Sequence, residues 1–240
     1  MSNARRIGAS ALALRAFESG EALAAALAAR VAGALVDRLQ TAPRAGLAVS
    51  GGTTPVRFFQ ALAKQQIDWR SVDVTLVDER WVGEQSERSN ARLVREHLLH
   101  GGAAAARFVS LTTPGSPPED GVDEVAARID ALPLPFAAVV LGMGEDGHTA
   151  SFFPKGDGLA AALDPRTTNR AAVIRAPAAS EPRITLTFPV LRAASLLLLH
   201  IEGEAKLRTL RAAEQTGPIE DMPIRAFLRG GQPLEVFWRP

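Results

Sequence analysis

Short apolar runs alternate with longer amphipathic segments along the chain. Residues 21–39 are rich in alanine and leucine with interspersed charges, and Ser19 precedes them as an N-cap. This pattern predicts a long helix. Shorter helices are predicted at residues 56–64, 91–99, 123–132 and 204–213. In the first two of these, Pro55 is expected at the first helical position and Asn90 as the N-cap.

The apolar runs predict strands at residues 47–50, 72–77, 108–111, 136–141, 171–175, 183–188, 195–201 and 234–237. Strands that alternate with helices need right-handed crossovers, which make the strands parallel and place helices over the sheet. We therefore predict an α/β fold with a three-layer, mostly parallel, Rossmann-like sheet and helices on both faces. The chain has no fixed-period repeat and no low-complexity linker, so residues 1–240 are expected to form one domain.

The composition narrows the classes of function. Of the 240 residues, 47% are hydrophobic, enough to bury a sizeable core. Lysine and arginine number 27 and acidic residues 26, so the chain lacks the basic field that nucleic-acid binding needs. An anionic ligand must therefore be bound by a local group of donors or positive charges and not by a general positive field. The absence of cysteine excludes disulfides, thiolate zinc sites and a cysteine nucleophile.

From this sequence we expect neither a targeting signal nor a membrane span. Residues 1–20 carry three arginines and lack a continuous apolar run that ends in a small-residue cleavage site, so we expect them to belong to the mature protein. Strictly apolar runs such as residues 196–199 are far shorter than the ~20 residues that a membrane helix needs. A cytoplasmic protein is expected.

Three unusual polar segments follow apolar strands, at residues 50–55, 78–90 and 142–154. Ligands of open parallel sheets bind beyond the carboxyl ends of the strands, where such segments gather. The first segment, SGGTTP, offers two glycines, three hydroxyls and the free N–H groups of a helix start, which together suit a phosphate. An ordinary glycine turn with Thr54 as N-cap explains it equally well. It is not a P-loop, because the Gly-Lys-Ser/Thr ending is missing.

The third segment places Asp146 two residues before His148 in a glycine-rich turn. Both side chains can face one cavity, where the histidine would act as a general base, although a capping or packing role is the simpler alternative. The other histidines, His97, His100 and His200, have structural interpretations on predicted helices and strands. No cluster of ligands suggests a metal.

The second segment begins with Asp78, Glu79 and Arg80, charges of both signs at the end of an apolar strand. A surface salt-bridge cluster would explain such a triplet in isolation. Its position at a strand end favours a functional site instead.

Together these segments resemble the 6-phosphogluconolactonase family, in the superfamily of glucosamine-6-phosphate deaminase and ribose-5-phosphate isomerase. The resemblance runs through most of the chain. It is carried, in this order, by SGGTTP (50–55), DER (78–80) with Ser89 and Asn90, GMGEDGHTASFFP (142–154), RITLTFPVL (183–191) and GEAK (203–206). Thr53 replaces the usual serine, and Phe152-Phe153 the usual leucine-phenylalanine. The stretch 81–89 lacks the family's proline and paired aspartates, which leaves the roles of Glu87 and Arg88 open.

The resemblance implies a sugar-phosphate lactone as substrate, hydrolysed in the oxidative pentose phosphate pathway without cofactor or metal. Residues that would hold the phosphate are Ser50, Gly51, Gly52, Thr53, Arg183 and Lys206. At the lactone, His148 would take a proton from the attacking water while Asp146 sets its tautomer. Arg80, with backbone N–H groups of residues 142–147, would stabilise the oxyanion. Asp78 would orient Arg80 or bind a sugar hydroxyl.

Three alternatives remain open. A glucosamine-6-phosphate deaminase shares the phosphate turn and the Asp-Gly-His core, but it resembles this chain less in the residues that follow. A serine hydrolase would use Ser50 with His148 and Asp146, although the chain lacks a G-x-S-x-G elbow around Ser50. A non-catalytic sugar-phosphate sensor on the same fold is the third alternative, because fold alone does not confer chemistry.

Overall fold

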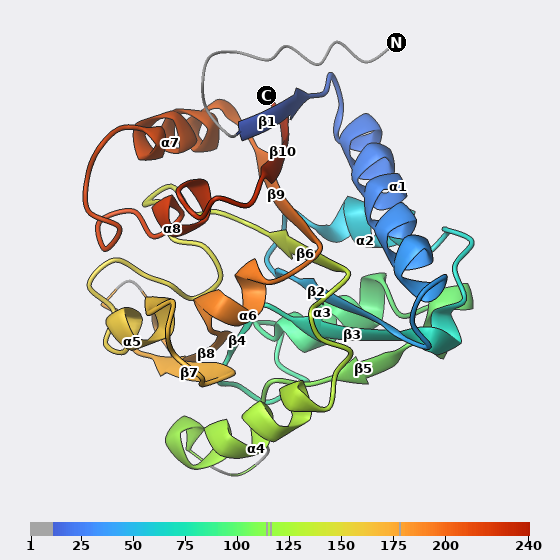
Figure 1. The fold of residues 1–240 in the computed structure, drawn as a ribbon, viewed down its shortest axis with the longest axis horizontal. Coiled ribbons are helices and arrows are strands. Elements are labelled where there is room, and N and C mark those ends of the chain that lie inside the picture. Colours follow the sequence, from blue (N-terminus) through green and yellow to red (C-terminus); the bar gives the residue numbers. More distant parts are fainter. Residues whose placement is uncertain (1–11, 114, 116, 178) are drawn as a thin grey trace.

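The computed structural model describes residues 12–113, 115, 117–177 and 179–240 (Figure 1). The prediction that residues 1–20 belong to the mature protein falls mostly on residues 1–11, which lie outside the described residues. Within the described part of the chain, no helix combines the length and apolar character needed to cross a membrane.

A seven-stranded sheet forms the centre of the molecule, and every neighbouring pair of its strands is parallel. Its strands in spatial order are β1 (Leu12–Ala16), β10 (Leu234–Arg239), β9 (Leu196–Glu202), β6 (Ala138–Leu141), β2 (Ala45–Val49), β3 (Val72–Leu76) and β5 (Arg107–Val109). The central strands β2, β3 and β6 are buried along their whole length. That burial explains why β2 and β6 read as continuous apolar runs, while in β3 the polar residues Asp73 and Thr75 are buried as well.

Helices cover both faces of this sheet, which confirms the predicted α/β class. α1 (Gly20–Leu39) and α2 (Val56–Leu62) pack together on one face, with α3 (Asn90–His97) against α2. On the other face lie α6 (Phe188–Arg192), α7 (Glu204–Glu214) and α8 (Arg225–Leu228) (Figure 1). α1 turns a stripe of Leu23, Leu27, Val31 and Leu35 toward the core, at the spacing of an amphipathic helix.

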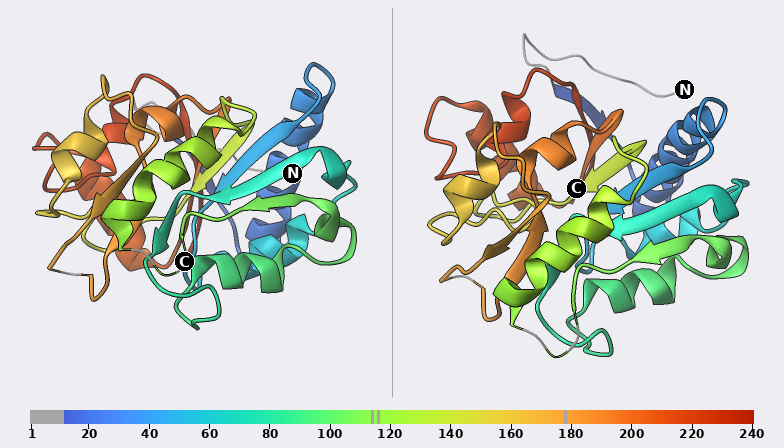
Figure 2. Two further views of the ribbon diagram at one scale, coloured as in Figure 1. Left: turned by 90° about the horizontal axis from the view of Figure 1, so that it is seen from below. Right: turned by 60° about the horizontal axis from the view of Figure 1, so that its bottom comes forward.

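A second, three-stranded sheet departs from the prediction. β4 (Asp78–Arg80), β8 (Arg183–Leu186) and β7 (Ala171–Ile174) form an antiparallel sheet of their own. The chain leaves the main sheet at Val77, whose N–H donates to Val49 O while its carbonyl accepts from Leu186 N. α4 (Pro118–Asp130) packs against β7 and β8, beside which both views of Figure 2 place it.

Several boundaries also differ from the prediction. Ser89, not Asn90, is the N-cap of α3, because its side chain accepts from the N–H of Arg92 and Asn90 is already helical. Pro55 is itself the N-cap of α2. α4 begins at Pro118, ahead of the predicted start. Elements that we did not predict are β1, β4, α5 (Leu159–Leu163), α6, α8 and two 3-10 turns at Trp69–Ser71 and Gly101–Ala105. Most are short, and so carry little periodic signal.

The order of the strands locates the crevice of the sheet. From β2 the chain crosses to β3 on one side, whereas from β6 it goes on to β9 on the other side. β2 and β6 are neighbours, so the connections diverge between them. At such a switch point the loops beyond the carboxyl ends leave a crevice open to a ligand.

Glu202 is the last residue of β9, and its carboxylate links this strand to β10. Its carboxylate accepts from His200 Nε2 at 3.2 Å and from Arg239 Nε at 2.7 Å. The hydrogen bond from His200, with further help from Arg239 and against the effect of burial, lowers the pKa of Glu202 to about 2. The ionised carboxylate is therefore more stable in the folded protein than in the unfolded chain.

We expect Glu202→Gln to lower the free energy of unfolding at neutral pH by about 2 kcal/mol. Because the pKa of Glu202 is depressed on folding, this stabilisation is complete above the ordinary glutamate pKa. It is lost as the pH falls toward 2. The difference between wild type and variant, from urea unfolding, should therefore shrink between pH 5 and pH 2. The exposed Glu220→Gln serves as the control. A difference that is constant with pH would contradict the assignment.

Candidate active site

A cavity of about 390 Å³ lies at the carboxyl ends of β2, β6 and β9. Nine of the ten predicted site residues line it: Ser50, Gly51, Gly52, Thr53, Asp78, Arg80, His148, Arg183 and Lys206. The tenth, Asp146, contacts His148 from behind. The structure thus brings together residues from five separate segments of the chain. The cavity is also lined by Asn90, Phe58, Phe153 and His200, which are not among the predicted site residues.

His148 and Asp146 form a hydrogen-bonded pair at this cavity. His148 Nδ1 lies 2.6 Å from Asp146 Oδ1, which also accepts the backbone N–H of His148 at 3.1 Å. Burial raises the pKa of Asp146, but the hydrogen bonds and charge of His148 outweigh burial, so the net shift is downward. A carboxylate only accepts, so Nδ1 carries the hydrogen and Nε2 keeps a lone pair free to take a proton.

The glycines of the turn make room for this histidine. A Cβ on Gly144 would lie 2.3 Å from the His148 ring, and Gly147 has φ +80°, so larger residues are excluded at both positions. The Phe153 ring packs 4.4 Å from the imidazole, centroid to centroid. The N–H groups of Gly142, Gly144, Gly147 and His148 all donate within the protein. These four groups are therefore not free to bind an oxyanion.

Ser50 is held by the neighbouring strand. Its N–H and its O–H both donate to the carbonyl of Val140, at 2.9 Å and 3.0 Å, and its Oγ accepts the N–H of Gly142 at 2.8 Å. A serine has one backbone and one hydroxyl donor, and both are engaged here. Ser50 therefore lines the cavity as expected but offers no free donor to a phosphate or to His148.

Arg80 is oriented by Asn90. Arg80 Nη1 donates to Asn90 Oδ1 at 3.0 Å and to the carbonyl of Arg88 at 2.8 Å, while Asn90 Nδ2 donates to the carbonyl of Asp78 at 3.0 Å. The carboxylate of Asp78 instead accepts from Ser151 Oγ at 2.5 Å. Of the two roles considered for Asp78, this geometry favours binding of a sugar hydroxyl. Asn90 also packs against Gly51, where a Cβ would lie 1.9 Å from its Oδ1.

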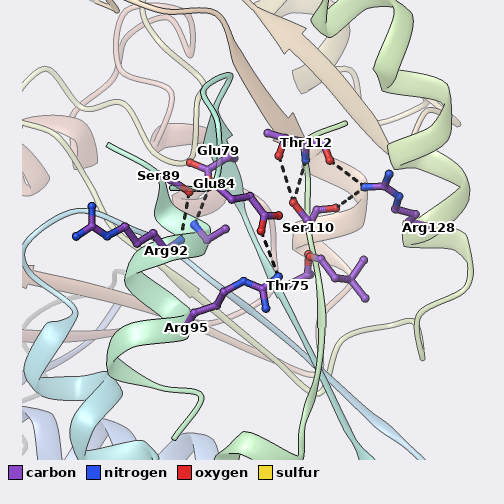
Figure 3. Close-up of polar contacts among 11 residues, drawn as sticks. Thr75, Glu79, Glu84, Ser89, Arg92, Arg95, Ser110, Thr112 and Arg128 are labelled. Atoms are coloured by element: carbon purple, nitrogen blue, oxygen red, sulfur yellow. Dashed lines mark hydrogen bonds and ion pairs between the residues drawn. The ribbon is translucent and has the colours of Figure 1, made fainter. Parts of the chain in front are cut away.

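The buried carboxylate of Glu79 binds free N–H groups at the N-terminus of α3. It accepts the N–H groups of Arg80, Asn90 and Ala91 and the hydroxyl of Ser89, which lies beside it in Figure 3. Burial raises the pKa of Glu79, and the backbone hydrogen bonds oppose the shift. The carboxylate satisfies the free donors of a helix N-terminus and so positions Asn90 beneath Arg80. An acidic residue within a mixed charged triplet gave no signal of this role.

Arg183 lies opposite Arg80 in the small sheet. Its Nε is buried without a hydrogen-bond partner among the described residues, and its guanidinium lies 5.5 Å from the centre of the Phe153 ring. Burial lowers the pKa of Arg183, the charge of Asp78 opposes this shift, and the charge of Arg80 adds to it. Two neighbouring cations with an unused donor favour an anion between or beside them. Lys206 reaches the same cavity from the first turn of α7.

The remaining candidates have structural positions. Arg88 forms an ion pair with Glu181 and a hydrogen bond to Ser180, and Glu87 is exposed. His200 is buried on β9 as expected, yet it also lines the cavity with its ring near the edge of Phe58. In the described part of the chain, no group of three or more histidines and carboxylates is arranged to hold a metal.

The structure is that of an α/β protein with a cavity that is lined by a glycine loop able to bind an anion and by a histidine that is hydrogen-bonded to an aspartate. A model of the family described as glucosamine-6-phosphate isomerases/6-phosphogluconolactonase matches residues 18–238. The chain belongs to this family. It is 48% identical over 225 residues to the 6-phosphogluconolactonase of Rhizobium meliloti, covering 93% of this chain and 97% of that protein. For the 6-phosphogluconolactonase of Pseudomonas aeruginosa the identity is 46%, covering 95% and 94%.

Solved structures agree with the family. The crystal structure of a 6-phosphogluconolactonase from Shewanella baltica matches with a TM-score of 0.92 at 40% identity, covering 95% of this chain and 97% of that chain. A monomeric glucosamine-6-phosphate deaminase matches with a TM-score of 0.76 at 16% identity, covering 94% and 96%. At that identity the second likeness concerns the fold alone.

Proposed function

We propose that this chain hydrolyses 6-phosphoglucono-1,5-lactone to 6-phosphogluconate, in the cytoplasm and in the oxidative pentose phosphate pathway. The observation that carries the proposal is the His148–Asp146 pair in one cavity with Arg183, Lys206 and the glycine loop after β2. The substrate has an electrophilic ester at one end and a dianion at the other. The names of the relatives from Rhizobium meliloti and Pseudomonas aeruginosa support the same activity.

His148 is the general base of the proposed reaction. Its Nε2 accepts a proton from water as the water oxygen bonds to C1 of the lactone, and the carbonyl oxygen becomes an oxyanion. Asp146 stabilises the imidazolium that forms. Arg80 supplies positive charge to the oxyanion. When the tetrahedral intermediate collapses, the bond from C1 to the ring oxygen breaks, and the imidazolium returns its proton to that oxygen.

The phosphate is held by cations and by backbone. Arg183 and Lys206 supply charge, and the buried Nε of Arg183 is a donor that no described residue accepts from. Gly51, Gly52 and Thr53 bring the backbone close to the ligand at the start of α2. Ser50 supports this loop from below, because its donors are already engaged with Val140. That engagement also argues against Ser50 as a nucleophile.

We expect purified protein to accelerate hydrolysis of the lactone, generated from glucose 6-phosphate, equally well with and without EDTA. The reason is that the proposed water activation needs a histidine and no metal. Loss of activity in EDTA and its recovery with a divalent metal would overturn the water-activation model. Release of ammonia from glucosamine 6-phosphate at a comparable rate would move the assignment to the deaminases.

Arg183→Ala and Lys206→Ala should each weaken binding of the phosphorylated lactone by roughly 1.5–3 kcal/mol, the scale of a charge-assisted hydrogen bond. Steady-state KM and product inhibition measure the effect. Binding of unphosphorylated gluconolactone should hardly change in either variant. The exposed Lys64→Ala is the control for lost surface charge. Equal losses on both substrates would assign these residues to the fold or to the chemistry.

His148→Asn should lower kcat by about two to four orders of magnitude, because general base catalysis contributes on that scale. Asparagine keeps a donor for Asp146, so KM and thermal stability should change little. The wild-type kcat should fall on acidification, since a protonated imidazole accepts no proton. His97→Asn, on α3 and outside the cavity, is the matched control. Near-normal turnover of His148→Asn would refute the mechanism.

A further inference from the structure

Gly142 is the first residue after β6 and begins the turn that carries Asp146 and His148. Both polar groups of its backbone are bound by side-chain hydroxyls. Its N–H donates to Ser50 Oγ at 2.8 Å, and its carbonyl accepts from Thr149 Oγ1 at 2.7 Å. The two hydroxyls come from opposite directions in the sequence. Gly142 is thus held between the loop after β2 and the residue that follows His148.

The hydroxyl of Ser50 forms a bridge rather than a single bond. It donates to the carbonyl of Val140 at 3.0 Å while accepting from the N–H of Gly142, so it bridges the two residues on either side of Leu141, the last residue of β6. The N–H of Ser50 strengthens the same link by donating to Val140 O at 2.9 Å. The ends of β2 and β6, from which the two proposed ligand-binding loops start, are therefore joined at one point.

The hydroxyl of Thr149 closes the other end of the turn. Thr149 is fully buried, and its bond to Gly142 spans the loop from its first residue to the residue after the histidine. Inside this closure, the N–H of Gly144 donates to the carbonyl of His148 at 2.9 Å. The position of the imidazole over Gly144 therefore depends on how far apart the ends of the turn lie.

We propose that Ser50 and Thr149 are positioning residues that clamp the Gly142 peptide and set the place of His148 relative to the phosphate loop. This inference rests on the lactonase activity proposed above. Neither hydroxyl needs to touch the substrate. Their effect comes through geometry, since a misplacement of about 1 Å between base and substrate can cost on the order of a hundredfold in rate.

Thr149 gives the sharpest test, because its variants separate shape from hydrogen bonding. Thr149→Val keeps the shape and removes the hydroxyl, and Thr149→Ser keeps the hydroxyl. On the phosphorylated lactone, we expect Thr149→Val to lower kcat roughly tenfold to a hundredfold with little change in KM. Thr149→Ser should retain most of the wild-type turnover.

Thr75→Val is the matched control for loss of a buried hydroxyl. Thr75 Oγ1 donates to the carbonyl of Val109 at 2.8 Å, which is the same kind of bond on β3, and Thr75 does not line the cavity. The two valine variants should lose similar thermal stability, and only Thr149→Val should lose turnover. Wild-type kcat in Thr149→Val, or equal kcat losses in both valine variants, would overturn the proposal.

Ser50→Ala is an independent test if Thr149→Val does not fold. A clamp residue should lower kcat when it is removed, whereas a simple phosphate ligand should raise KM and leave kcat unchanged. A pure KM effect in Ser50→Ala would therefore refute the clamp. If the wild-type protein itself fails to hydrolyse the lactone, the proposed function fails, which is distinguishable from failure of the clamp in an active enzyme.

Discussion

β2 and β6 lie side by side as parallel strands, and the chain leaves them in opposite directions. Parallel pairing makes both strands end at one edge of the sheet, so the loops that follow them lie together although 92 residues separate Ser50 from Gly142. The hydroxyl of Ser50 then ties the two ends with hydrogen bonds. The glycine loop and the histidine turn both start from this junction, and the cavity lies between them.

The small antiparallel sheet supplies the third wall of the cavity. It places Arg80 directly opposite Arg183, a pairing of like charges that costs free energy in the absence of an anion. Arg80 is partly compensated by Asn90 and the carbonyl of Arg88, whereas the buried Nε of Arg183 has no hydrogen-bond partner in the part of the chain that the structure describes. The protein thus holds positive charge in place before a ligand arrives. Such preorganisation suits binding and stabilisation of a negatively charged substrate.

Much of the fold followed from local pattern. The central strands bury both faces, so apolar runs located them well, and the glycine turns after β2 and β6 were evident. The second sheet was not predicted, because β4 continues an apolar strand in sequence and only its pairing with β8 separates the two. Asn90 was expected to cap a helix. Its side chain instead binds Arg80 and the carbonyl of Asp78, while Ser89 takes the cap.

The sequence by itself determined contacts between residues that are close neighbours within a single loop. Asp146 and His148 are two residues apart among glycines, so their pairing depends on local backbone geometry alone. Only the tertiary structure decided where the donors of Ser50 point and which residue holds Arg80. It also decided that Glu79 is buried at the start of α3. Each of these depends on strands and helices that are distant in sequence, and a hydroxyl or carboxylate binds whichever partner the packing brings within reach.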